Sequence, residues 1–206
     1  MNPKAKDPIN LIITGVGGQG NILISRLIGE TMIEEGYWVT VGETYGASQR
    51  GGSVASHVRI SKESQYSPIT PEGNAGIILG LEPVESLRML AVYGSMETYV
   101  LTNTRAIHPM SVSTREAEYP SFEDIKQSIS RISKKAWYID ASETAIDLGD
   151  PLLTNMVMAG ALVGSGLLPL DRDKFEYRLQ MSFQQNKLAL NLKAFNVGVT
   201  KMVGQR

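Results

Sequence analysis

The segment "INLIITGVGGQGN" at residues 9–21 decides the fold. Residues 9–14 form a short apolar run typical of a buried strand, and Gly15, Gly17 and Gly20 follow it in the spacing G-x-G-x-x-G. Glycines at this spacing close a tight turn between a strand and the helix after it. The segment therefore predicts the first strand, turn and helix of an α/β fold.

The helix predicted over residues 20–35 has Leu23, Leu27 and Ile28 on one stripe and a stop signal at Gly36. Further short apolar runs alternate with helix-like stretches, a rhythm typical of a mainly parallel sheet flanked by helices. These runs lie at 38–42, 77–81, 98–102 and 136–140.

The segment at 53–60 differs because its apolar and polar residues alternate, which predicts a strand with one face less buried. After about residue 150 only helices are predicted, over 152–163, 172–183 and 184–203. The expected fold class is thus α/β, with a Rossmann-like, mainly parallel sheet flanked by helices and a helical C-terminal third. Without a linker-like stretch, residues 1–206 are expected to form a single domain.

Composition excludes several function classes. The formal net charge is -1, with basic and acidic residues interspersed, so the chain has no electrostatic footprint for nucleic acid or an anionic membrane. It also lacks an apolar run long enough to span a bilayer and a signal peptide, so a cytoplasmic location is expected. The absence of cysteine excludes thiol nucleophiles and cysteine-ligated iron–sulfur clusters in this chain. His57 and His108 lie far apart without carboxylate partners, so no metal site is predicted.

Two interpretations of the glycine turn stay open at this point. The free N–H groups at a helix start favour a phosphate, but the same glycines also serve a turn with no ligand. Glu43, roughly twenty residues beyond the turn, stands where a dinucleotide fold places its ribose ligand. Gly18 and Gln19 are unusual inside such a turn. A P-loop is excluded, because no Lys-Ser or Lys-Thr follows the glycines.

A second candidate segment carries Ser48 and Arg50 directly before Gly51 and Gly52. The planar guanidinium of an arginine on a glycine-flexed loop binds a carboxylate or phosphate through two parallel hydrogen bonds. A plain surface arginine is the alternative. Ser48 is not predicted to be a hydrolase nucleophile, because Arg50 stands where the nucleophile elbow needs glycine.

Taken together, "GVGGQGN" at 15–21 and "SQRGGSVASHVRIS" at 48–61 resemble the gamma-type subunits of the 2-oxoacid:ferredoxin oxidoreductases, and most closely the beta subunits of their indolepyruvate branch. The likeness covers nearly the whole chain. It continues, in the order of the family, through "GLEPVESLRML", "VLTNTRAIHP" and "TNMVMAGALVGSGLLP". The sequence departs from the pattern at Gly76, where similar proteins commonly have an aspartate, so no role of that carboxylate carries over.

The resemblance implies a subunit of a complex that oxidatively decarboxylates a 2-oxo acid with coenzyme A, forming an acyl-CoA and reducing ferredoxin. Thiamine diphosphate and the iron–sulfur clusters then belong to partner subunits of a hetero-oligomer. This division agrees with the missing cysteines and with Gly149-Asp150, which precedes a proline instead of a thiamine-binding signature. The isolated chain is expected to be inactive, and no cofactor is assigned to it.

The resemblance assigns no catalytic residue, but it marks motif positions that either shape the subunit interface or bind a phosphate-bearing ligand such as coenzyme A. These positions are Gly15, Gly17, Gly18, Gln19, Gly20, Ser48, Arg50, Gly51 and Gly52. The competing hypotheses are a stand-alone dinucleotide-binding dehydrogenase, for which Glu43 is the evidence, and a nucleotide-sensing module without chemistry.

Overall fold

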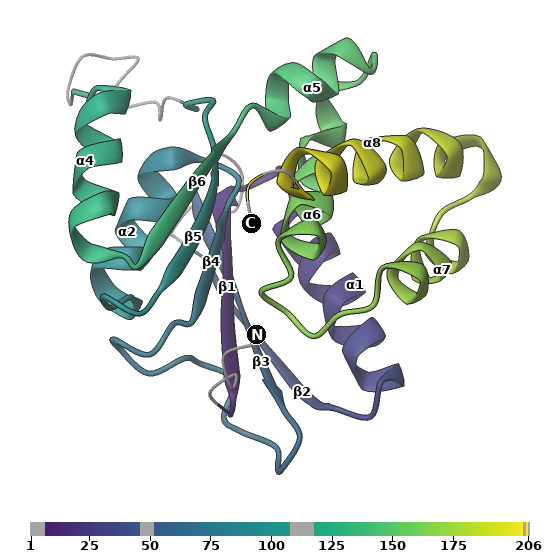
Figure 1. The fold of residues 1–206 in the computed structure, drawn as a ribbon, viewed down its shortest axis with the longest axis horizontal. Helices are drawn as coiled ribbons and strands as arrows, with labels where there is room; N and C mark the ends of the chain where they lie inside the picture. Colours follow the sequence, from purple (N-terminus) through teal and green to yellow (C-terminus); the bar gives the residue numbers. More distant parts are fainter. Residues whose placement is uncertain (1–6, 46–51, 108–117, 204, 206) are drawn as a thin grey trace.

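The computed structural model describes residues 7–45, 52–107, 118–203 and 205, and it has a six-stranded sheet between two layers of helices (Figure 1). In spatial order the strands are β2 (Trp38–Tyr45), β3 (Ser53–Ser61), β1 (Ile9–Val16), β4 (Ile77–Gly80), β5 (Tyr99–Asn103) and β6 (Lys135–Ile139). The helices are α1 (Asn21–Glu34), α2 (Pro83–Tyr93), α4 (Phe122–Ile132), α5 (Ala141–Asp147), the short 3-10 helix η1 (Pro151–Leu153), α6 (Thr154–Ser165), α7 (Arg172–Ser182) and α8 (Gln185–Val203).

The sheet is mainly parallel, as predicted. β1, β4, β5 and β6 pair in parallel, whereas β3 pairs antiparallel with both β1 and β2. The chain thus leaves β1 through α1, forms the edge strand β2 and returns as β3 between β2 and β1. This inserted strand makes the fold a variant of the Rossmann arrangement, in which the first two strands are neighbours.

The prediction that residues 53–60 have one less buried face is wrong. β3 lies inside the sheet, and every residue after Ser53 is buried. Its polar side chains are covered by the segment that follows the strand: Arg59 donates to Asn10 Oδ1 at 2.9 Å and to the Ser67 carbonyl at 3.0 Å. His57 is fully buried, and this burial lowers its pKa. The alternation therefore reflects polar side chains buried inside the fold and not solvent exposure.

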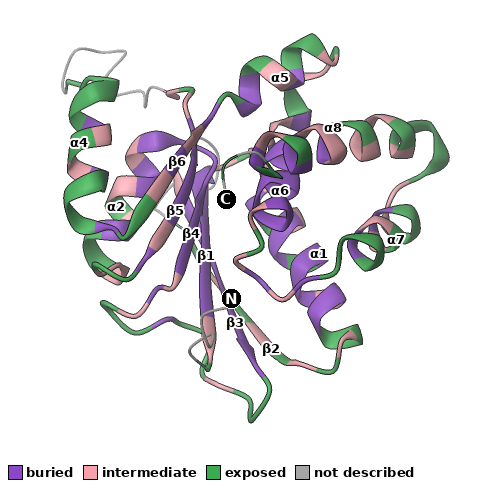
Figure 2. Cartoon of the chain, in the orientation of Figure 1, coloured by how far each residue is buried: buried purple, intermediate pink, exposed green. Residues whose placement is uncertain are grey.

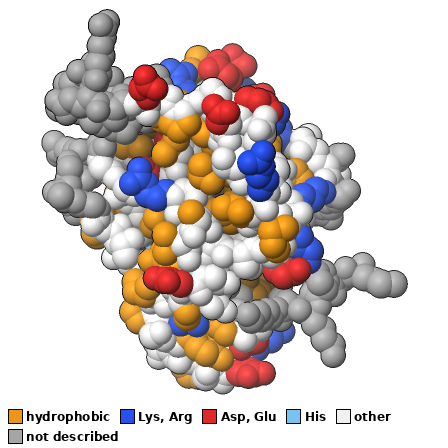
Figure 3. Space-filling view, turned by 90° about the vertical axis from the view of Figure 1, so that its left-hand side faces the viewer, with side chains coloured by type: hydrophobic (Ala, Val, Ile, Leu, Met, Phe, Trp, Pro, Cys, Tyr) orange, Lys and Arg blue, Asp and Glu red, His pale blue; other side chains and the backbone are white. Residues whose placement is uncertain are grey.

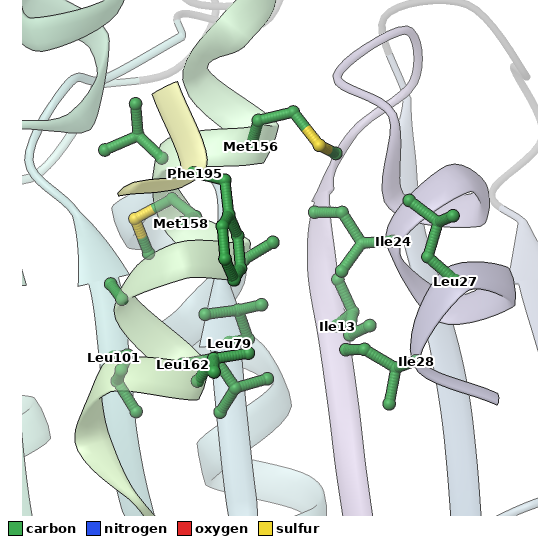
Figure 4. Packing of buried hydrophobic residues seen from close by; sticks show 14 of the residues in the cluster. Ile13, Ile24, Leu27, Ile28, Leu79, Leu101, Met156, Met158, Leu162 and Phe195 are labelled. Carbon is green, nitrogen blue, oxygen red and sulfur yellow. The ribbon is translucent and has the colours of Figure 1, made fainter. Parts of the chain in front are cut away.

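Neighbouring residues of the central strands face opposite helical layers, because side chains alternate along a strand. Ile13, Leu79 and Leu101 point toward α1, α6 and α8, as Figure 4 shows. Ile12 and Ile78 belong to a second cluster, together with buried residues of α2 and α4. Both sheet faces are therefore buried, which explains the continuous apolar runs of these strands (Figure 2).

The helical C-terminal third is confirmed, and α6 and α8 are packed backbone against backbone. A Cβ added to Gly160 of α6 would lie 2.0 Å from the Phe195 carbonyl oxygen, and one added to Gly198 of α8 would lie 2.0 Å from the Val157 carbonyl oxygen. Residues 155–164 of α6 are all buried. Apolar residues therefore surround the whole helix, as is typical of a helix inside the core. Among the α-helices of the described residues, α5 was not predicted from the sequence.

The outer surface of α2 and α4 carries scattered apolar side chains among charges of both signs (Figure 3). Val92, Met96 and Phe122 are among the exposed apolar residues of this region. No helix in the described part of the chain is long and apolar enough to cross a membrane.

Candidate functional site

The sheet has its topological switch point between β1 and β4. β1 continues into α1 on one face, and β4 continues into α2 on the other. Open α/β sheets bind ligands in the crevice at the carboxyl ends of such a strand pair. Gln19 spans this crevice, since its Nε2 donates to the Leu81 carbonyl at 2.9 Å and its Oε1 accepts from Val16 N at 2.6 Å. The glycine turn is thereby fixed to the end of β4.

Close packing and backbone conformation explain the glycines of the turn. A Cβ at Gly15 would lie 2.5 Å from Gln19 Oε1, so this glycine makes room for the bridging side chain. Gly18 and Gly20 have φ angles of 103° and 90°, which other residues rarely adopt. Gly20 also serves as the N-cap residue of α1, with no side-chain cap of its own.

The structure brings the two predicted segments together at one point. Gly17 N donates to the Gly52 carbonyl at 2.8 Å, so the start of β3 lies beside the glycine turn. Ser48, Arg50 and Gly51 lie outside the described residues. Of the predicted site residues, Gly15 and Gly17 are therefore engaged in holding the turn, whereas Gly18 and Gln19 line a pocket.

This pocket has a volume of about 430 Å³ and lies at the carboxyl edge of the sheet. It is bounded by the glycine turn, the segment after β5, helix α5, η1 and the first residues of α6. Its walls are formed by Gly18, Gln19, Arg105, Ile107, Ser142, Ile146, Pro151, Leu152, Thr154 and Asn155. Eight of these residues were missed from the sequence. The only signal for Arg105 was its position just after an apolar run, where parallel strands place functional groups.

Asn103, the last residue of β5, connects the elements beside the pocket through hydrogen bonds. Its Oδ1 accepts from the backbone N–H groups of Ala141 and Ser142, each at 3.2 Å, so it caps α5 from another strand. Its Nδ2 donates to the Leu81 carbonyl at 3.1 Å and to Ser142 Oγ at 2.9 Å. One buried amide thus ties the ends of β4 and β5 to α5, which keeps the pocket wall in place.

Glu82 holds in place the segment after β5, which forms another wall of the pocket. Its carboxylate is 1% exposed and caps α2 by accepting from Glu85 N at 2.8 Å. It also accepts from Ile107 N at 3.3 Å and from the Tyr119 hydroxyl. Burial and then this contact with Glu82 raise the pKa of Tyr119, so its hydroxyl stays protonated and donates. Glu82 therefore anchors the strand-to-helix segment that carries Arg105 and Ile107.

The sequence has no ligand for an iron–sulfur cluster, and the described residues have no grouped metal ligands. No cysteine is available for an iron–sulfur cluster, and no three His, Cys, Asp or Glu side chains in the described part are grouped to hold a metal ion. Asp150 uses its carboxylate as the cap of η1, accepting from Leu152 N at 2.9 Å.

The position of Glu43 removes the evidence for a dinucleotide site. It lies within β2, at the edge of the sheet, and accepts a hydrogen bond from the Tyr45 hydroxyl. Because β3 separates β2 from β1, Glu43 does not stand on the strand next to the glycine turn, where a ribose ligand belongs.

Comparison with known proteins identifies the chain. Residues 10–201 match the family model described as pyruvate ferredoxin/flavodoxin oxidoreductase. The chain belongs to this family. The indolepyruvate oxidoreductase subunit IorB of Pyrococcus horikoshii is 40% identical over 191 residues, which are 92% of this chain and 94% of that subunit. As a member of the pyruvate ferredoxin/flavodoxin oxidoreductase family, the chain is an oxidoreductase subunit, which confirms the resemblance to this family seen in the sequence.

Solved structures show the same fold in this family. The gamma subunit of a keto/oxoacid ferredoxin oxidoreductase from Geobacter sulfurreducens has a TM-score of 0.68 and 21% identity, covering 95% of this chain and 99% of its own. A 2-oxoglutarate:ferredoxin oxidoreductase from Magnetococcus marinus has a TM-score of 0.75 and 21% identity, covering 98% of this chain and 32% of its own. The same fold therefore occurs both as a separate subunit and within a longer chain.

Replacing Gly20 with alanine tests how tightly the turn is packed. We expect the free energy of unfolding to fall by about 2 kcal/mol, because a Cβ would strain a positive φ and lie 2.2 Å from Asn155 Nδ2. Gly36→Ala is the control, since its φ is 82° but nothing lies within 4 Å of the added carbon. We expect it to cost about 1 kcal/mol. Urea unfolding measures both, and equal losses would contradict the contact with Asn155.

Proposed function

We propose that the chain is the gamma-type subunit of a cytoplasmic indolepyruvate:ferredoxin oxidoreductase, with residues 1–206 forming one domain. In this complex an aryl-substituted 2-oxo acid is oxidatively decarboxylated to an acyl-CoA, and ferredoxin takes the electrons. The observation that carries the proposal is the end-to-end match with the Pyrococcus horikoshii subunit, at 40% identity over 92% of this chain and 94% of that one.

We assign thiamine diphosphate and the iron–sulfur clusters to a partner subunit, because this chain has no cysteine to bind a cluster and no thiamine-binding signature after Gly149-Asp150. The role of this chain in the complex is to provide a surface that binds the partner subunit or an anionic ligand. The glycine turn is hydrogen-bonded to Gly52, the last residue of the second predicted segment, through Gly17 N. We propose that the carboxyl edge of the sheet faces the partner subunit and that Arg50 clamps an anionic group of the coenzyme, of the substrate or of the partner.

Co-expression with and without the cluster-bearing partner tests this function. The chain alone is expected to show no turnover with indolepyruvate, coenzyme A and an artificial electron acceptor, whereas the co-purified complex turns over. Within the complex, indolepyruvate is expected to have a higher kcat/KM than pyruvate or 2-oxoglutarate. Turnover by the chain alone, or failure to associate with the partner, contradicts the subunit assignment. A preference for pyruvate contradicts the substrate class.

A further inference from the structure

We propose that the strap, defined as residues 62–76 between β3 and β4, is a pH-sensitive cover of the sheet. Its middle part, residues 66–70, lies over β3 and is released when the imidazole of His57 becomes protonated. This release involves the chain alone, so it is independent of the proposed function.

Side chains of β3 hold the middle of the strap, whereas a backbone bond holds its far end. Arg59 Nη1 donates to the Ser67 carbonyl at 3.0 Å and to Ser67 Oγ at 3.1 Å. Thr70 N donates to His57 Nδ1 at 3.4 Å. Nearer to β4, Gly73 N donates to a carbonyl group of α2 at 3.2 Å. The middle can therefore open while the far end stays in place.

His57 is fully buried and incompletely hydrogen-bonded. Because Nδ1 accepts from Thr70 N, the neutral ring carries its proton on Nε2, and this N–H has no hydrogen-bond partner among the described residues. The ring instead meets the Tyr93 ring edge to face, with the centroids 5.0 Å apart. Thr70 Oγ1 is also buried without a described partner. Two unsatisfied polar atoms thus lie where the strap meets His57, which weakens the closed contact.

The positive charge nearest to His57 along its strand favours the neutral imidazole. Arg59 lies two residues further along β3 and on the same face, because side chains alternate along a strand. Its side chain is buried, and Cζ lies 4.9 Å from the centroid of the Tyr66 ring of the strap. α2 contributes the aromatic ring of Tyr93. A proton on His57 would therefore place a second positive charge in a buried region.

The carboxylates of the surrounding elements do not compensate such a charge. Glu85 and Asp7 accept hydrogen bonds from the first and last residues of β3, at 2.5 and 2.6 Å, and both of these residues are four positions away from His57. Glu43 of β2 is paired with the residue next to His57, so it points to the other face of the sheet. The other charged residues of the strap and of α2 are exposed: Lys62, Glu63, Glu72 and Arg88.

Protonation weakens the closed contact in two ways. Nδ1 of an imidazolium is a donor, so it no longer accepts from Thr70 N. A buried positive charge beside Arg59 is also costly, and an open strap admits water to it. Burial lowers the pKa of His57 while the strap is closed, and opening returns this pKa toward its ordinary value. Closure is therefore fully stabilised above about pH 6.5 and is weakened as the pH falls below it.

Hydrogen exchange of the full chain tests the proposal. The Thr70 amide is expected to lose protection about fivefold or more between about pH 7.5 and about pH 5.5, after correction for the intrinsic exchange rate. The Gly73 amide of the same strap is the internal reference and is expected to keep its protection. Nitrogen-15 NMR of the imidazole is expected to show His57 becoming protonated as the Thr70 amide loses protection.

His57→Gln is the decisive variant, because glutamine keeps an acceptor for Thr70 N and does not titrate. We expect protection of the Thr70 amide in this variant to be the same at both pH values. His108→Gln is the matched control, since it removes the other histidine of the sequence, and it is expected to keep the pH dependence of the wild type. If His57→Gln does not fold, the imidazole titration of the wild type decides.

The proposal is overturned if the Thr70 amide is equally protected at both pH values, or if it loses protection to the same extent in His57→Gln. An equal loss at Gly73 also overturns it, because the fold then opens as a whole. So does a protonated His57 beneath a Thr70 amide that stays protected. These outcomes are read on the chain alone, so they are distinct from a failure of subunit assembly or of turnover, which tests the proposed function.

Discussion

Gly198→Ala is expected to lower the free energy of unfolding by about 3 kcal/mol. The added carbon would lie 2.0 Å from the Val157 carbonyl oxygen and 2.9 Å from Ala161 N, both backbone atoms of α6. Neither can rotate away, so α8 must move off α6. Gly160→Ala is expected to lower the free energy of unfolding by a similar amount, because its added carbon would lie 2.0 Å from the Phe195 carbonyl oxygen. The cost exceeds the gain of about 1 kcal/mol that alanine brings to a helix interior.

Gly29→Ala is the matched control, because Gly29 is also buried in a helix but its added carbon meets only Val39 and Val41 side chains, at 3.5 and 3.6 Å. These are ordinary contact distances. We expect the control to be neutral or to raise stability by up to about 1 kcal/mol. Urea unfolding followed by circular dichroism measures the three variants. Equal stability of Gly198→Ala and Gly29→Ala would show that α6 and α8 are not in backbone contact.

Glu82→Ala is expected to cost about 3 kcal/mol as well, for an electrostatic reason. The substitution leaves three donors in a buried site without their acceptor: Glu85 N, Ile107 N and the Tyr119 hydroxyl. Glu82→Gln keeps one acceptor oxygen and is expected to lose less. The measurement is the free energy of unfolding, together with protection of the Ile107 amide from hydrogen exchange.

Glu97→Ala is the control for this prediction. Glu97 is 80% exposed and pairs with Lys134 at 2.7 Å on the surface, so its loss is expected to change stability by about 0.5 kcal/mol or less. If Glu82→Ala unfolds at the same urea concentration as Glu97→Ala, the buried carboxylate does not anchor the segment after β5. Unchanged exchange of the Ile107 amide would lead to the same conclusion.

The local sequence determined much of the fold because strand and helix periods leave a direct trace in it. The run at 9–14, the glycine turn and the three C-terminal helices were all predicted with nearly correct bounds. The position of β3 was not predictable, since pairing between β1 and β2 depends on contacts far apart in sequence. Its alternating pattern was therefore interpreted as exposure, although Arg59 and His57 are buried under residues 66–70.

The only residues of the candidate site that could be predicted are those that belong to a sequence motif. Gly18 and Gln19 belong to a recognisable turn, whereas Arg105 and Asn155 come from separate elements that meet only in the folded chain. Asn155 stands in the apolar stretch "TNMVMAGALVG", which indicates core packing. Nothing in that stretch shows that its side chain lines a pocket.

The packing of α8 has a consequence for synthesis. α8 leaves the ribosome after α6 and after all six strands, yet α6 and the sheet face carrying Leu79 and Leu101 belong to the same core as its Phe195 and Val199. Until α8 has emerged, a nascent chain presents that apolar face to the surrounding solution, where incompletely packed intermediates aggregate. Premature termination anywhere before α8 should therefore yield an insoluble fragment, because this core is complete only after α8 has been translated.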